Sequence, residues 1–294
     1  MPAVTADRRL LGITLALVSA ASFGVMPVLT KVVYDGGADP VGVLAVRFAL
    51  AAVVLQVLAR RETRPPARTL VLLAGLGGIG YVGQALCYFF ALERISAGLT
   101  SLLLYVYPAL VVVLAAVVLR DRPRPLAAGC VVVATTGTAL TIGPVQGGQG
   151  TGVLLGLAAA LVYAVYILVS SRVRGVGPLT TAAWVLTSSA VVMGVIALLS
   201  SPRLPSTAAS WLALVGVALI GTVVAVTTFF AALALLGPSD TAVVSTVEPV
   251  VSIAVAALLL GERLRPLQLV GGVVVLLAVG VLARARRAVE PVPV

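Results

Sequence analysis

Histidine is missing from this sequence, and cysteine is scarce. The 294 residues include no histidine and only two cysteines, Cys87 and Cys130, which do not form a CxxC pair. Without histidine the chain lacks the commonest acid–base group near neutral pH, and without CxxC it lacks the usual zinc and redox motifs. We therefore predict no metal site. The sequence also argues against a membrane-embedded enzyme, because the acidic residues of the chain are scattered and the chain has no Ser–His or Cys–His set.

Charge is scarce too. Charged residues make up 10% of the chain and hydrophobic residues 61%, whereas soluble domains carry about 25% charged residues. Apolar stretches of 18 or more residues are typical of transmembrane helices in contact with lipid. We expect an all-α polytopic membrane protein with ten transmembrane helices. The ten segments are 10–34, 40–58, 69–92, 97–119, 125–143, 152–173, 178–200, 208–236, 239–260 and 266–284.

The basic residues that produce the net charge of +10 lie in short clusters between the apolar segments. This pattern is typical of cytoplasmic loops and not of a nucleic-acid-binding surface. With the N-terminus placed inside, fourteen Lys and Arg residues fall on the inner side and five on the outer side. We therefore expect both termini in the cytoplasm. The chain has one lysine against nineteen arginines and abundant Ala, Val and Gly, a composition that suggests a GC-rich bacterial genome, so we expect a bacterial inner-membrane protein.

The first apolar segment has two interpretations. Arg8 and Arg9 precede it, and Ser19-Ala20-Ala21 resembles a signal-peptidase site. However, the apolar run continues to Val33, well beyond the usual length of a signal peptide, so we favour an uncleaved first helix.

The sequence repeats itself at a constant offset of 141 residues, which we call the repeat offset. It relates helices 3 to 5 to helices 8 to 10. Gly75 corresponds to Gly216, Phe89 to Phe230, Thr100 to Thr241 and Pro108 to Pro249. Each half therefore has five helices, and an odd number places the second half upside down in the membrane, as in many secondary transporters. We divide the chain into a first repeat (1–143), a linker (144–151), a second repeat (152–287) and a short tail (288–294).

A glycine-rich stretch, Gly75-Leu-Gly-Gly-Ile-Gly80, fits GxGxxG. A dinucleotide-binding motif of this form should follow a strand and open a helix, but this stretch lies inside an apolar helix. Small residues in such a position favour close helix packing, so we predict no cofactor.

Glu248 is the only ionisable residue between Thr241 and Gly261. A carboxylate at mid-membrane costs about 2.5–3.5 kcal/mol on insertion scales. Together with Thr241, Ser245 and Ser252 it falls within a stripe of about 60° on a helix that is otherwise apolar. Pro249 has no N–H, so the carbonyl of Ser245 loses its intrahelical partner. Glu248 and that carbonyl could accept hydrogen bonds from a ligand. Alternatively, Glu248 could pair with a basic residue and lock two helices together.

Two basic residues are candidate partners for Glu248 or for a ligand. Lys31 lies near the end of the first helix and Arg47 in the first half of the second. Lys31 could instead extend to the membrane interface. Arg47 has no such simple explanation, because it lies well inside its segment.

Several other helices carry polar or aromatic faces that could line a shared central cavity. They contribute Tyr81, Gln84, Tyr88, Tyr163, Tyr166 and Phe23. Tyr107 occupies the repeat position of Glu248. Pro27, Pro108 and Pro249 are the expected helix breaks.

These features resemble the EamA-like family of the drug/metabolite transporter superfamily over almost the whole chain. The resemblance is carried by Ser22-Phe23-Gly24, Lys31, Arg47-Phe48, Tyr107-Pro108, Asp121-Arg122, Glu248-Pro249 and Gly261-Glu262-Arg263-Leu264. It implies ten helices related by an inverted pseudo-two-fold axis. It also implies a central cavity lined mainly by helices 1, 3, 4, 6, 8 and 9.

The resemblance further implies movement of a small metabolite, such as an amino acid, by alternating access. We predict a secondary active transporter, an exporter, with Glu248 as a ligand acceptor or a site of proton coupling. The alternative is a membrane-embedded sensor or scaffold that binds a ligand without transporting it.

Overall fold

The protein is an all-helical bundle in the residues that its computed structural model describes, and these contain no strand. The described residues are 2–107, 109–111, 114, 129–130, 132–133, 136–137, 140, 149–170, 173, 175–245, 247–263 and 265–287. The helices of the first half are α1 (Pro2–Asp35), α2 (Pro40–Ala59), α3 (Ala67–Gly75), the π-helical turn η1 (Leu76–Tyr81), α4 (Val82–Arg94) and α5 (Ala97–Leu104). The helices of the second half are α8 (Gln149–Ser170), α9 (Pro178–Ser200), α10 (Ala208–Ala218), the π-helical turn η2 (Leu219–Val224), α11 (Ala225–Ser245), α12 (Val247–Leu260) and α13 (Pro266–Arg287).

Six helical stretches within the described residues are long and apolar enough to span a membrane. They are Arg8–Asp35, Pro40–Ala59, Ala67–Arg94, Gln149–Ser170, Pro178–Ser200 and Ala208–Ala232. Shorter apolar helices include Val247–Leu260 and Pro266–Ala278. Of the ten predicted segments, 97–119 falls partly and 125–143 mostly outside the described residues.

The outer surface of the bundle is apolar, as contact with lipid requires. Leu198 and Leu199 of α9 are 86% and 84% exposed, and Leu258 of α12 is 82% exposed. Exposed large apolar side chains occur on most of the described helices, among them Leu154 of α8 and Leu212 of α10. The interior holds Phe48 of α2 and Phe89 of α4, both almost fully buried.

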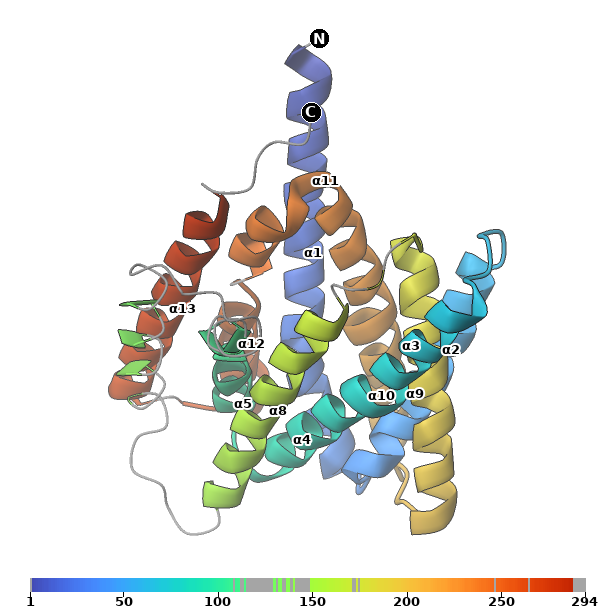
Figure 1. The fold of residues 1–294 in the computed structure, drawn as a ribbon. Coiled ribbons are helices and arrows are strands. Elements are labelled where there is room, and N and C mark those ends of the chain that lie inside the picture. Colours follow the sequence, from blue (N-terminus) through green and yellow to red (C-terminus); the bar gives the residue numbers. More distant parts are fainter. Residues whose placement is uncertain are drawn as a thin grey trace.

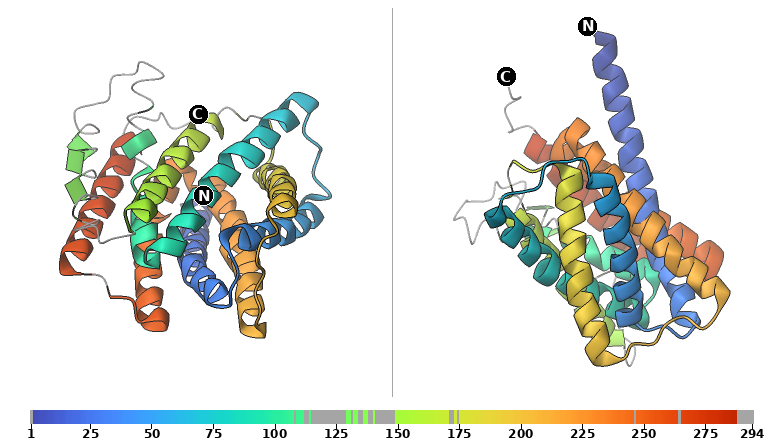
Figure 2. Two further views of the ribbon diagram at one scale, coloured as in Figure 1. Left: turned by 90° about the horizontal axis from the view of Figure 1, so that it is seen from below. Right: turned by 90° about the vertical axis from the view of Figure 1, so that its right-hand side faces the viewer.

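Helices α2 and α9 pack side by side and run in opposite directions (Figure 2). At one end Asp39 caps α2 by accepting from Gly42 N (2.8 Å), and its second oxygen accepts from Arg203 N (2.8 Å), just after α9. At the other end Glu62, just after α2, accepts from the N–H and hydroxyl groups of Thr180 in the first turn of α9. Two carboxylates therefore fasten the start of each helix to the end of the other.

The two halves share an unusual local feature, because each contains a six-residue π-helical turn inside a long helix. The turn η1 lies in the third predicted segment and η2 in the eighth, so their positions nearly correspond under the repeat offset. The glycine-rich stretch forms most of η1, where a Cβ on Gly77 would overlap the Val185 carbonyl and Ser188 of α9. These glycines therefore allow close helix packing. Turns of this kind often mark functional sites.

The predicted helix breaks differ from those observed. Helix α1 runs without interruption from Pro2 to Asp35, so the expected break at Pro27 is wrong. The predicted boundary between 236 and 239 is also wrong as a break in helical structure, because α11 continues to Ser245 and bends over at its upper end (Figure 1). The new helix α12 begins at Val247, so Pro249 lies in its first turn. A proline is tolerated there because that N–H would have no intrahelical acceptor.

The predicted linker and the predicted helix break at Pro108 lie partly or wholly outside the described residues. Of the linker 144–151, helix α8 already includes the last three residues, from Gln149. Pro108, residues 144–148 and the tail 288–294 lie outside the described residues. The first residues of α1 and the last residues of α13 lie at the same end of the bundle (Figure 1).

Candidate functional site

Glu248 lies where α11 gives way to α12, in the first turn of α12, and its side chain is partly buried. Its Oε2 atom lies 2.9 Å from the Tyr105 hydroxyl. The same hydroxyl donates to the carbonyl of Ser245 at 2.5 Å. Since Pro249 cannot supply an N–H to that carbonyl, the phenol replaces the missing backbone partner. An acid in the first turn is also favoured by the helix dipole.

Arg47 is the second charged group inside the bundle, and only 2% of it is exposed. Its Nε donates to Thr222 Oγ1 (2.7 Å) and its Nη2 to the Tyr81 hydroxyl (3.1 Å). The guanidinium carbon lies 5.2 Å from the ring centres of both Phe48 and Phe89. Tyr81 belongs to η1 and Thr222 to η2, so one arginine connects the π-helical turns of the two halves.

A continuous row of aromatic rings, which we call the tyrosine ladder, connects the surroundings of Arg47 to those of Glu248. The ring centres of neighbours lie 4.7 to 6.0 Å apart, within the range of favourable aromatic contacts. The closest pair is Tyr107 and Tyr163, which meet edge to face. In order from the Arg47 end, the ladder consists of Phe48, Tyr81, Tyr166, Tyr163, Tyr107 and Tyr105.

Three hydroxyl groups of the ladder and the amide of Gln84 in α4 are not completely buried. The hydroxyls of Tyr107, Tyr163 and Tyr166 and the amide of Gln84 make no hydrogen bond to the described residues. Yet within those residues no fully buried side-chain nitrogen or oxygen lacks a partner. These four groups therefore each keep some exposure, although Gln84 as a whole is only 8% exposed. Unpaired polar groups that are not completely buried are available to a ligand.

A chain of hydroxyls runs between α4, α5 and α12. The Tyr88 hydroxyl lies 3.2 Å from Ser101 Oγ, which lies 2.8 Å from Ser252 Oγ. Both serines are almost completely buried. The chain of hydroxyls therefore connects three helices inside the bundle.

Lys31 reaches a different part of the bundle. Its Nζ donates to the carbonyl of Ile95 (2.8 Å), at the end of α4. On the other side of this joint Glu262 accepts from Ala97 N (3.0 Å) and Gly98 N (3.4 Å), at the start of α5. A cation at a helix C-terminus and an anion at a helix N-terminus each complement the local dipole.

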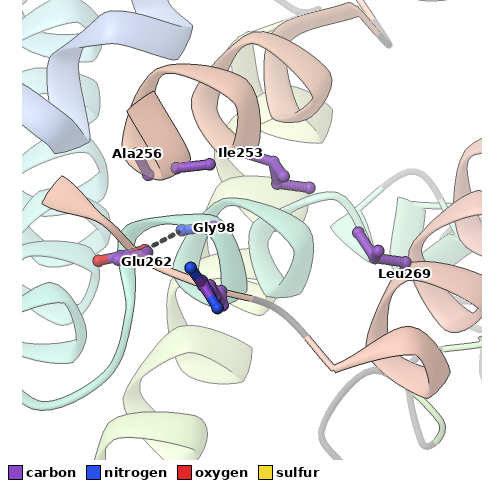
Figure 3. Close-up of a pocket in the computed structure, with 7 residues that line it drawn as sticks. Gly98, Ile253, Ala256, Glu262 and Leu269 are labelled. Carbon is purple, nitrogen blue, oxygen red and sulfur yellow. Dashed lines mark hydrogen bonds between the residues drawn. The ribbon is translucent and has the colours of Figure 1, made fainter. Parts of the chain in front are cut away.

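A pocket of about 290 Å³ opens beside Glu262, and Figure 3 shows the carboxylate directed at Gly98. The other lining side chains are mainly apolar and come from α12 and α13, including Ile253, Ala256 and Leu269. The pocket lies about 10 Å along α5 from Tyr105, at 1.5 Å per residue. It is therefore distinct from the ladder.

The structure brings most of the predicted site residues together but not as direct ion pairs. Within the described residues Arg94–Glu93 is the only ion pair within 4.0 Å, so neither Lys31 nor Arg47 neutralises Glu248. Phe23 is partly buried in α1 and makes no ring contact to the described residues. Thr241 and Ser245 are buried in α11, while Glu248 and Ser252 lie in α12, so the predicted stripe is divided between two helices.

Sequence reasoning missed Tyr105, Ser101 and Thr222. The repeat offset pointed to Tyr107 opposite Glu248, and Tyr105, two residues earlier, makes the contact instead. Thr222 could have been found, since the same repeat offset pairs it with Tyr81. No periodic signal distinguishes Ser101 from other small polar residues in apolar helices.

Comparisons with known proteins agree with this architecture. The sequence model of the EamA-like transporter family matches residues 10–143 and 150–284, which are two copies of the repeat. No curated protein matches the chain. A solved structure, described only as a crystal structure of a protein, is similar with a TM-score of 0.69 and 20% sequence identity. The similarity covers 97% of this chain and 99% of the other, and it shows a shared fold.

Proposed function

Because the chain belongs to the EamA-like transporter family, we propose that it exports a small metabolite across the cell membrane by alternating access. The substrate is an amino acid or a related compound. The observation that supports this best is the tyrosine ladder between Arg47 and Glu248, which carries unpaired hydroxyl groups that are not completely buried. Such a row offers apolar contact along its length and an opposite charge at each end.

Alternating access needs two halves that can exchange roles, and the second repeat is inverted relative to the first in our proposal. The pairing of α2 and α9 supports this inversion, because the second helices of the two repeats run in opposite directions. A carboxylate links the two helices at each end. The π-helical turns at corresponding positions support it as well. Inverted repeats are common in secondary transporters, whose substrates bind near the bilayer midplane at the repeat interface.

We further propose that Glu248 takes up and releases a proton during transport. The Tyr105 phenol has one proton but contacts two oxygen atoms, on Ser245 and Glu248. When the phenol donates to the carbonyl of Ser245, a protonated Glu248 can donate in turn to the phenol oxygen. When Glu248 is ionised, the two acceptors compete for the phenol proton. The hydrogen-bonding pattern therefore changes with the charge on Glu248.

We place the protein in a bacterial inner membrane with both termini in the cytoplasm. The excess of basic residues on that side, fourteen against five, supports the orientation. The start of α1 and the end of α13 lie at one end of the bundle, which agrees with termini on the same side (Figure 1).

The test is flux of amino acids in proteoliposomes at several pH values, with Glu248→Gln as the variant. We expect the variant to lose the pH dependence of transport, since glutamine keeps the shape of the side chain but cannot titrate. The matched control is Glu93→Gln, because Glu93 pairs with its neighbour Arg94 at the exposed surface. Transport by Glu248→Gln equal to wild type at every pH would contradict the proton role. Ligand-dependent stabilisation without flux would favour a sensor or scaffold instead.

A further inference from the structure

We propose that Arg47 is the site that binds the carboxylate group of the transported molecule, between the two π-helical turns. This rests on the proposed transport function and identifies a chemical class of substrate, compounds with a free carboxylate. The ligand would replace Thr222, and partly Tyr81, as hydrogen-bond acceptors of the guanidinium.

The charge of Arg47 is not compensated by any carboxylate of the described residues. Within the described residues no Asp or Glu lies within 4.0 Å of Arg47, although only 2% of the residue is exposed. Burying a charge is unfavourable unless it is paired. The rings of Phe48 and Phe89 offset part of this cost by cation–π attraction. A bound carboxylate supplies the counter-charge that the described residues do not.

Arg47 also has hydrogen-bonding capacity that the described residues do not use. A guanidinium has five N–H groups in a fixed fork, and in Arg47 one goes to Thr222 and one to Tyr81. The other three have no hydrogen-bond partner in the described part of the chain. Since no fully buried polar atom there lacks a partner, the unpaired Nη1 touches accessible space. A carboxylate matches this fork in the bidentate manner that makes arginine suited to such ligands.

The present acceptors of Arg47 can be replaced by a ligand at a small cost in free energy. Thr222 Oγ1 also donates to the Val217 carbonyl (3.0 Å), so its hydroxyl keeps a hydrogen bond when Arg47 leaves it. Both acceptors are neutral hydroxyls, and charge-assisted bonds to a carboxylate are roughly twice as strong. Binding a carboxylate therefore exchanges weaker bonds for stronger ones.

The position of Arg47 connects binding to the arrangement of the two halves. Tyr81 and Thr222 are related by the repeat offset, and they come from η1 and η2. While Arg47 donates to both, it connects the two halves through one side chain. A ligand that takes over these bonds loosens this connection, so occupancy of the site alters the contact between the repeats.

The test uses four matched compounds that share one side chain: leucine, leucinamide, 3-methylbutylamine and 4-methylpentanoate, with further sets for the other common side chains. Purified protein in detergent is titrated with each compound, and affinity is read from the rise in the unfolding midpoint. In at least one set we expect the amino acid to bind about 10- to 100-fold more tightly than its amide, as expected for a hydrogen bond to a charged group. The same ratio should fall close to one in Arg47→Gln.

A second variant keeps the proposal testable if Arg47→Gln does not fold. Thr222→Val removes one acceptor that competes with the ligand but leaves Arg47 in place. We expect it to bind the amino acid as tightly as the wild type or more tightly. If Arg47 only holds the halves together, Thr222→Val will destabilise the protein. The amino acid and its amide will then bind with nearly equal affinity, in this variant as in the wild type.

The outcomes separate the two proposals. Equal binding of acid and amide in all sets, or an unchanged preference in Arg47→Gln, overturns the carboxylate site. If amines and amides are transported as well as the acid, the carboxylate site is overturned but the transport proposal is supported. Carboxylate-selective binding that requires Arg47, without flux in proteoliposomes, keeps the site and overturns the transport proposal.

Discussion

Replacing Tyr105 by phenylalanine tests whether the joint between α11 and α12 depends on a single hydroxyl. Only 3% of Tyr105 is exposed, and its hydroxyl contacts the carbonyl of Ser245 and Oε2 of Glu248. Phenylalanine keeps the ring and its contact with Tyr107 but removes both polar contacts. The Ser245 carbonyl would then lose the partner that replaces a backbone N–H, because Pro249 has none to offer.

The expected loss follows from the cost of an unsatisfied buried acceptor. Removing one partner of a buried hydrogen bond costs about 1–3 kcal/mol, and the nearly unchanged volume adds little. We therefore expect Tyr105→Phe to lower the free energy of unfolding by about 1–3 kcal/mol. The measurement is unfolding by SDS titration in detergent micelles.

The matched control lies two residues away. The Tyr107 hydroxyl makes no hydrogen bond to the described residues, while its ring packs edge to face on Tyr163. Tyr107→Phe should therefore change the free energy of unfolding by no more than about 0.5 kcal/mol. A loss as large in Tyr107→Phe as in Tyr105→Phe would show that the Tyr105 hydroxyl does not stabilise this joint, and so would an unchanged stability of Tyr105→Phe.

Two further predictions concern packing and capping. A Cβ on Gly24 would lie 2.7 Å from the Glu248 carbonyl oxygen, so Gly24→Ala should push α1 away from α12 and cost about 1–3 kcal/mol. Gly194→Ala meets nothing within 4 Å and should gain about 0.5–1 kcal/mol in the same unfolding assay; the reverse order would contradict this packing. Asp39→Ala removes an N-cap and the acceptor for Arg203 N, which should cost about 1–2 kcal/mol. The control Glu93→Ala breaks a surface pair worth about 0–1 kcal/mol, and an equal loss in both variants would argue against the fastening role of Asp39.

The sequence predicted the membrane class and the two repeats because both depend on patterns along the chain. Long apolar runs are visible without any fold, and a constant repeat offset needs only comparison of the chain with itself. Helix ends were predicted less well. Pro27 was expected to break α1 but lies inside it, because tertiary packing can hold a helix together across a proline. The segment 208–236 was expected to end at residue 236, yet α11 continues to Ser245.

The candidate site was predicted in its residue types but not in its connections. Glu248, Arg47 and the tyrosines were identified because charge and aromatic rings are conspicuous in apolar helices. Their partners were not, because a hydrogen bond such as that between Arg47 and Thr222 joins residues 175 positions apart. Such a contact is decided by how whole helices pack and cannot be read from local spacing.

Patterns along the sequence are therefore enough to predict that this chain crosses a membrane, that it repeats and that it carries an acid and an arginine where lipid would exclude them. Hydrophobic transfer acts residue by residue, so these properties can be predicted without knowledge of the fold. The packing of the helices was needed to find that Tyr105 and not Tyr107 contacts Glu248, and that Arg47 joins the two π-helical turns instead of neutralising the acid. Hydrogen bonds act over about 3 Å, and the packing of the two halves sets which atoms come that close.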